Sequence, residues 1–264
     1  MRAAAPKIHD YRDYSREFLS LSDQALQKGE TLKGADYLRS AEFYMFPDDS
    51  RKQSARCEFA RLMREHFRVT DEACHSVPYD TWKLSSYRFT TPGSRGTIVL
   101  FGGFDSYIEE LFPTQFYLLD AGFDVVAFEG PGQGSVLEEE HLTMTHEWEK
   151  PVKAILDYFQ LDDVTLIGYS LGGCLAMRAS ARERRVRRVV ADDILTDLFD
   201  VSLRQVSPFV RFTLSGLLKI DAAPLVNALL ARAMKGSLVI EWGPRQGMHL
   251  CDRAVSALET HRAS

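Results

Sequence analysis

A single serine stands between glycines in the segment GYSLGG, residues 168–173. Gly168, Ser170 and Gly172 fit the pattern G-x-S-x-G, in which the serine occupies a strained turn between a strand and a helix. The apolar run before the serine predicts that strand, and the segment after it predicts the helix. We therefore expect Ser170 to be a nucleophile that projects beyond the carboxyl end of a sheet. A tight turn with an idle serine is the structural alternative.

A serine that attacks a carbonyl group also needs hydrogen-bond donors for the oxyanion that forms. Leu171 offers one backbone N–H, because the first amides of a helix have no partner within the helix and favour an anion. The loop FGGFDSYIEE (101–110) offers a second, from Gly103 or Phe104, because paired glycines let the backbone approach a substrate. A turn without a catalytic role is again the alternative.

Serine is a poor nucleophile near neutral pH unless a base takes its proton. The sequence offers Asp197 as the acid of a triad, in the loop expected after the sixth strand. It offers His249 as the base, provided that SLVIEWG (237–243) is a strand. The structural alternatives are a capping or solvated loop residue for the aspartate and a lid residue for the histidine. His261 is a further histidine after Ser170, and the remaining five precede it.

Strands and helices must alternate to hold these residues together. Two short strands are expected at 73–79 and 82–90. The later expected strands are 96–103, 123–134, 163–170 and 186–195, and the helices between them are 107–122, 146–161 and 171–185. This alternation of near-continuous apolar strands with helices predicts an α/β fold, a mostly parallel sheet with helices on both faces. The glycine-rich FEGPGQG (128–134) lacks the Lys and Ser/Thr of a phosphate-binding loop, so we interpret it as a turn at the sheet edge.

The regions before and after this core have a helical texture. Aromatic and aliphatic residues recur at steps of three and four from Tyr11 to Ala25, and two further helices follow, the last with Ser50 as its expected cap. The apolar stretch after residue 200 is interrupted by Pro208 and Pro224, as expected of a lid. We predict an N-terminal helical segment (1–72), a core (73–200), a helical lid (201–250) and a terminal helix (251–264).

The overall composition favours a soluble cytoplasmic protein. The 264 residues carry a net charge of −5, which argues against a nucleic-acid-binding protein, and the basic run 178–188 is interpreted as a solvated helix end. No secretory signal or apolar run of ~20 residues is found, so no membrane partner is expected. The four cysteines are far apart and lack CxxC spacing, so no metal site is predicted.

With these motifs the chain resembles the α/β-hydrolases. It resembles more narrowly the branch with an N-terminal helical segment that includes 2,6-dihydroxypseudooxynicotine hydrolase and the polyketide-type hydrolases. The matching segments are GADYLRSAEFYMF, VLFGGFDSYIEELF, FEGPGQG, IGYSLGG and ADDILTDLFDV. The resemblance implies an eight-stranded core with a helical lid after the sixth strand. It also implies hydrolysis of esters, amides or activated C–C bonds with no metal or organic cofactor.

In that family the acid and the histidine follow the seventh and eighth strands. No strand–Asp segment followed by a strand–His segment is found after Ser170, so we expect a core that is truncated at its C-terminus and lacks the last two strands. The predicted function is a serine hydrolase that cleaves an ester or related carbonyl bond, C–C bonds included, through a Ser170 acyl-enzyme. Its partner is a small-molecule substrate, and a homo-oligomer is allowed. The alternative is a truncated, catalytically impaired relative that binds a ligand or a partner.

Overall fold

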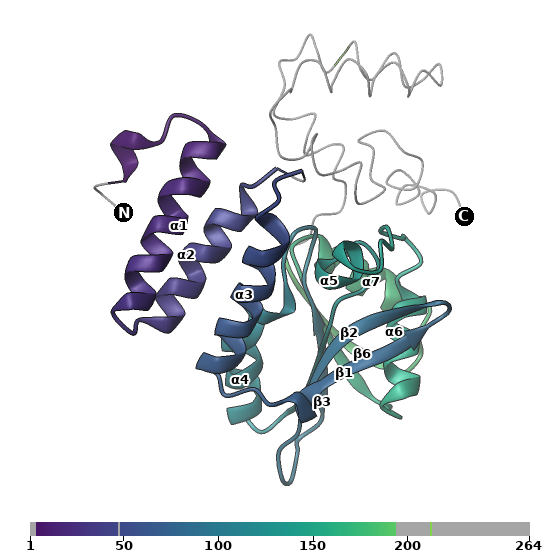
Figure 1. Cartoon of the computed structure of the whole chain (residues 1–264). Helices are drawn as coiled ribbons and strands as arrows, with labels where there is room; N and C mark the ends of the chain where they lie inside the picture. The colour runs from purple at the N-terminus through teal and green to yellow at the C-terminus, as the bar shows by residue number, and fades with distance from the viewer. Residues whose placement is uncertain (1–3, 47, 194–211, 213–264) are drawn as a thin grey trace. The chain divides into compact units, whose positions relative to one another are not determined.

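The structure is a computed structural model that describes residues 4–46, 48–193 and 212. It divides the chain into two compact units, Met1–Ala73 and Cys74–Ser264 (Figure 1). Asp197, His249, His261 and the strand expected at 237–243 lie outside the described residues. The predicted terminal helix (251–264) and the predicted lid, apart from Phe212, lie outside them as well.

The N-terminal unit contains the three expected helices, α1 (Tyr11–Gln27), α2 (Thr31–Phe43) and α3 (Lys52–His66), after a short 3-10 turn, η1 (Ala5–Lys7). The first helix is capped by Asp10, whose side chain accepts the N–H of Asp13. The expected cap at Ser50 is wrong. The residue that precedes α3 is Arg51, which makes no side-chain cap, and its own N–H is donated to Asp49 Oδ1.

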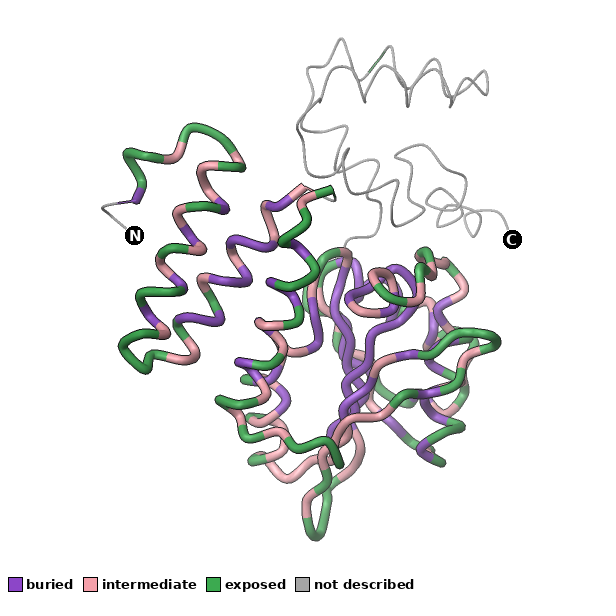
Figure 2. The backbone as a smooth tube through the Cα atoms, viewed as in Figure 1, coloured by how far each residue is buried: buried purple, intermediate pink, exposed green. Residues whose placement is uncertain are grey.

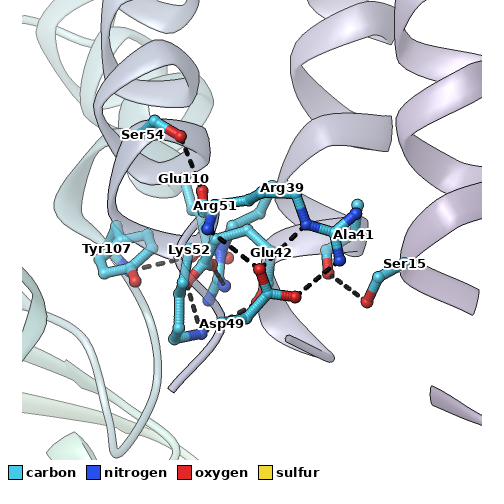
Figure 3. A network of polar contacts seen from close by, with 10 residues as sticks. All are labelled: Ser15, Arg39, Ala41, Glu42, Asp49, Arg51, Lys52, Ser54, Tyr107 and Glu110. Atoms are coloured by element: carbon cyan, nitrogen blue, oxygen red, sulfur yellow. Dashed lines mark hydrogen bonds and ion pairs between the residues drawn. The ribbon is translucent and has the colours of Figure 1, made fainter. Parts of the chain in front are cut away.

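A buried ion cluster joins α2 to α3 in this unit. Glu42 is fully buried, and its carboxylate lies between the side chains of Arg39 and Lys52 (Figure 3). The ammonium of Lys52 donates to Glu42 Oε1 at 2.6 Å and to the Glu42 carbonyl at 2.9 Å. Because a buried charge needs an opposite charge nearby, this cluster constrains how the two helices pack.

The second unit is built on a sheet whose six described strands run in the order β1-β2-β4-β3-β5-β6. The strands are β1 (Cys74–Tyr79), β2 (Trp82–Phe89), β3 (Thr97–Phe101), β4 (Asp124–Phe128), β5 (Val164–Tyr169) and β6 (Val186–Asp192). β3 pairs in parallel with β4 and β5, and β5 with β6, whereas β1 and β2 form an antiparallel hairpin at one edge. The predicted α/β class is confirmed, with a mixed sheet.

Helices cover this sheet between its parallel strands: η3 (Ile108–Leu111) with α4 (Phe112–Asp120), α5 (Gly134–Glu138), α6 (Glu149–Tyr158) and α7 (Leu171–Ser180). In the strand order, β4 lies on one side of β3, and β5 and β6 lie on the other side of it. The connection from β3 to β4 therefore runs across the sheet in the opposite direction to those from β4 to β5 and from β5 to β6. Right-handed crossovers therefore place α4 on one face of the sheet and α6 and α7 on the other (Figure 1). The short helix α5 was not predicted, because five residues are too few to show a helical period.

The central strands are buried on both faces, which explains their continuous apolar runs (Figure 2). On the α6 side the fully buried Trp148 packs against the rings of Phe101 and Phe128, with centroids 5.4 and 6.3 Å away. This packing fixes the strands whose carboxyl ends carry the loops described next.

Three arginines of the basic run 178–188 form ion pairs with nearby carboxylates. Arg182 pairs with Glu149, Arg185 with Asp157 and Glu183, and Arg188 with Asp163. These pairs agree with a solvated helix end. In the described ranges the structure contains no helix of the length and apolar character that a membrane crossing requires.

Candidate active site

Ser170 occupies the turn between β5 and α7. Its backbone angles are φ 55° and ψ −123°, a conformation that side-chain-bearing residues adopt only under constraint. The N–H of Ser170 donates to the carbonyl of Asp192 on β6 at 2.7 Å, and its carbonyl accepts the N–H of Gly173 at 2.9 Å. The residue is exposed. The strained strand–helix turn expected from the sequence is therefore present.

The glycines of the motif are required by close backbone contacts. A Cβ at Gly168 would lie 2.0 Å from the carbonyl oxygen of Gly172. A Cβ at Gly172 would lie 2.4 Å from the carbonyl oxygen of Gly102, in the loop after β3. Because backbone atoms cannot yield as a flexible side chain can, glycine at these positions lets α7 start directly against that loop.

The loop after β3 lies against the serine. A Cβ at Gly103 would be 3.0 Å from Ser170 Cβ, 2.9 Å from the carbonyl oxygen of Tyr169 and 3.1 Å from the nitrogen of Leu171. The sequence prediction named Ser170, Leu171 and Gly103 as parts of one site, and the fold brings these three residues together. The N–H of Gly103 donates to Ser106 Oγ at 3.0 Å.

A residue that the sequence prediction missed, Gln133, holds the same loop. Its side chain is 1% exposed, and its Nε2 donates to the carbonyls of Gly102 at 2.6 Å and Gly103 at 2.9 Å. Its Oε1 accepts the N–H of Gly130 at 3.0 Å. The glycine-rich FEGPGQG is thus more than a turn at the sheet edge. A long amide side chain among glycines, after a strand adjacent to β3, is the signal that could have indicated this role.

A buried carboxylate follows β4 in the same motif. Glu129 is 2% exposed, and its Oε1 accepts the N–H of Ile108 at 3.2 Å. Its Oε2 accepts the N–H of Ser135 at 2.7 Å and also the hydroxyl of that serine, which lies at hydrogen-bond distance from Ser85 Oγ as well. The carboxylate therefore connects the far end of the loop after β3 to the start of α5.

The family model described as the alpha/beta hydrolase fold matches residues 96–239, which include both loops and the serine turn. The chain belongs to the α/β-hydrolase family.

Curated relatives of this α/β-hydrolase are fungal proteins. "Hydrolase LUC6" of Fusarium sp is 30% identical over 83% of the chain, and "20-hydroxy-prefusarin hydrolase FUS2" of Gibberella moniliformis is 28% identical over 84%. The chain spans 61% of the length of each.

Solved structures share its fold. The 2,6-dihydroxy-pseudo-oxynicotine hydrolase superposes with a TM-score of 0.57 at 21% identity, covering 95% of this chain and 68% of that chain. AbyA5 superposes with a TM-score of 0.64 at 20% identity, covering 91% and 69%. The predicted resemblance to this branch is confirmed.

Two other nucleophilic side chains lie near the serine turn of the hydrolase. Burial raises the pKa of the Cys174 thiol in α7, which keeps it protonated and poorly nucleophilic. Burial also raises the pKa of Tyr169, and the nearby Asp192 raises it further, while a hydrogen bond to Thr114 acts in the opposite direction. Both groups are therefore neutral near pH 7, and Ser170 is the exposed hydroxyl at the strand end.

The acid and base predicted for the hydrolase, Asp197 and His249, lie outside the described residues, so both roles stay predictions. Within 4–46 and 48–193, no hydrogen bond joins a histidine to Ser170. In the same ranges, no cluster of three or more His, Cys, Asp or Glu side chains is arranged to hold a metal ion.

Proposed function

We propose that the protein is a serine hydrolase in which Ser170 attacks an ester or a related carbonyl group and forms an acyl-enzyme. The observation that carries this proposal is the strained, exposed Ser170 turn with the Gly103 loop packed directly against it. Such strain persists where the surrounding structure enforces it, and it is typical of functional sites.

The chemical steps follow from the nucleophile. Ser170 Oγ forms a bond to the carbonyl carbon, its proton passes to a base, and the electron pair of the C=O bond moves onto oxygen. Collapse of this intermediate expels the leaving group, which takes up the proton, and water then cleaves the acyl-enzyme. A C–C bond can be cleaved in the same way when the departing carbon is stabilised as an enol. His249 as base and Asp197 as acid are part of this proposal.

We place the oxyanion between the backbone N–H of Leu171 and a backbone N–H of the loop after β3, from Gly103 or Phe104. Leu171 is the first residue of α7, so its N–H has no acceptor within the helix. Of the two alternatives in the loop after β3, Gly103 already donates its N–H to Ser106 Oγ.

The names of the relatives favour a small organic substrate. FUS2 is named a 20-hydroxy-prefusarin hydrolase, and the solved neighbour is a 2,6-dihydroxy-pseudo-oxynicotine hydrolase. Both names describe hydrolysis of a low-molecular-weight compound. We propose a substrate of that class, with a carbonyl group at the scissile bond.

A fluorophosphonate probe tests the nucleophile. We expect the probe to modify Ser170, identified by mass spectrometry of the peptide that spans β5 and α7, and we expect Ser170→Ala to abolish the modification. Ser180→Ala, at the far end of the same helix, is the matched control and should be modified as fast as the wild-type protein. A cooperatively folded wild-type protein that is not modified would overturn the proposal and favour the ligand- or partner-binding alternative.

A further inference from the structure

We infer that Gln133 is a positioning residue that orients the backbone amides of the loop after β3 relative to the oxyanion formed at Ser170. The inference rests on the proposed function of Ser170. It is carried by three hydrogen bonds of one buried side chain, at 2.6, 2.9 and 3.0 Å, and by the planarity of the peptide bonds that they hold.

The orientation of the Gln133 amide is fixed by its partners. Two backbone carbonyls, of Gly102 and Gly103, can only accept hydrogen bonds, so they must face the NH₂ group. The N–H of Gly130 can only donate, so it must face Oε1. Both N–H bonds of the side-chain amide are used, and a flipped amide would put oxygen against two oxygens.

These bonds fix the direction of the next amides in the loop. In a planar trans peptide the C=O and N–H groups point in opposite directions. The carbonyl of Gly102 points to Gln133, and the N–H of Gly103 accordingly points away, to Ser106 Oγ. The carbonyl of Gly103 also points to Gln133, so the N–H of Phe104 must point away from it.

The base of this arrangement is rigid. Gly130 lies under the ring of Trp148, where an added Cβ would be 2.5 Å from a ring carbon. The N–H of Gly132 donates to the carbonyl of Leu142 at 2.8 Å, and the N–H of Gln133 donates to that of Gly130 at 3.0 Å. Because the backbone of Gln133 is fixed, its side chain can fix the loop after β3. The backbone donors of that loop are therefore in place before a substrate binds.

The test is Gln133→Glu, which preserves the shape but replaces the NH₂ donor with a carboxylate oxygen facing two carbonyls. Because one oxyanion donor is worth about 10²–10³ in rate, we expect fluorophosphonate modification of Ser170 to slow by at least about tenfold. Gln115→Glu is the matched control: Gln115 is also fully buried and donates to one backbone carbonyl, that of Ile108. Its rate should stay within about threefold of the wild-type rate.

A pH profile separates positioning from a general loss of stability. Protonation of the carboxylate that Gln133→Glu introduces restores one donor, so the ratio of variant to wild-type rate should rise as the pH falls. A merely destabilised protein would not show this recovery. If Gln133→Glu does not fold, the uncharged Gln133→Met should slow the modification to a similar extent without the pH-dependent recovery.

Hydrogen exchange of the Gly103 and Phe104 amides gives a readout that does not need a reactive serine. We expect faster exchange at these amides in Gln133→Glu than in the wild-type protein, with the β5 amides unchanged. If the probe modifies the wild-type protein and the Gln133→Glu variant at the same rate, the inference about Gln133 is overturned and the proposed function stands. An unreactive wild-type protein overturns the proposed function, and unchanged exchange at residues 103 and 104 then overturns the positioning role as well.

Discussion

At the scale of single residues, the exposed hydroxyl of Ser170 is carried by a strained backbone. Ser170 has φ 55° and ψ −123° between a parallel strand and a helix. Hydrogen bonds to Asp192 and Gly173 and contact with Gly103 hold it there. The cost of order 1–3 kcal/mol for such a residue is tolerated because these contacts enforce the conformation.

The strain predicts an unusual order of stabilities at this position. Ser170→Gly should have a free energy of unfolding about 1 kcal/mol higher than Ser170→Ala. Glycine avoids the backbone strain of the folded state, but the greater entropy of its unfolded chain offsets ~0.5–1 kcal/mol of that gain. At Ser20, an exposed position inside α1, the order should be reversed, with Ala more stable than Gly by about 1 kcal/mol. The same order at both positions would show that Ser170 is unstrained.

At the scale of elements, two loops at neighbouring strand ends are joined by side chains of the motif after β4. Gln133 bonds the start of the loop after β3, and Glu129 bonds its end at Ile108. Gly130, which lies between these two residues in the motif and donates its N–H to Gln133, packs against Trp148 at the start of α6. The packing at the start of α6 is therefore connected to the Ser170 turn through the loop after β3.

Trp148→Ala should reduce the free energy of unfolding by about 3–5 kcal/mol, because it empties a large, fully buried volume. Trp82→Ala is the matched control, since Trp82 lies at the β1–β2 hairpin with 37% of its surface exposed, and it should cost about 1 kcal/mol or less. Urea titration followed by far-UV circular dichroism measures both. Equal losses for the two variants would contradict the packing role of Trp148.

At the scale of the whole molecule, the chain forms two compact units with different kinds of interior. The second unit is built around a sheet whose central strands are apolar and buried on both faces. The first is a set of short helices that includes a buried ion cluster between α2 and α3. We therefore expect loss of a buried apolar side chain to destabilise the second unit, and loss of a buried charge to destabilise the first.

Glu42→Ala should destabilise the helical unit by about 3–5 kcal/mol, because the buried charges of Lys52 and Arg39 lose the carboxylate that compensates them. The matched control is Glu58→Ala in α3, where the carboxylate is 43% exposed and pairs with Arg61, and it should cost about 0–1 kcal/mol. Hydrogen exchange of the amides in α2 and α3 reports the difference. Equal protection in both variants would show that the cluster adds no local stability.

The sequence by itself determined the order of elements and the type of site. Apolar runs such as 164–169 and helical spacing such as Tyr11 to Ala25 are local patterns. Burial of both faces gives the strand its continuous run, and burial of one face gives the helix its spacing. The turn at Ser170 was also predictable, because its strain requires glycines at set positions in the same segment. The cap predicted at Ser50 is wrong, because α3 begins one residue later, after Arg51, whose N–H is accepted by Asp49 Oδ1.

The tertiary structure alone decided which loops touch. Gln133 and Gly103 are separated by the whole of α4 and β4, and their hydrogen bond depends on the pairing of β3 with β4. The burial of Glu129 and its hydrogen bond to Ile108 depend on the same pairing. Backbone hydrogen bonds between distant segments leave no periodic trace in a sequence, because any residue can supply a carbonyl, and only the packed sheet specifies which one faces the glutamine.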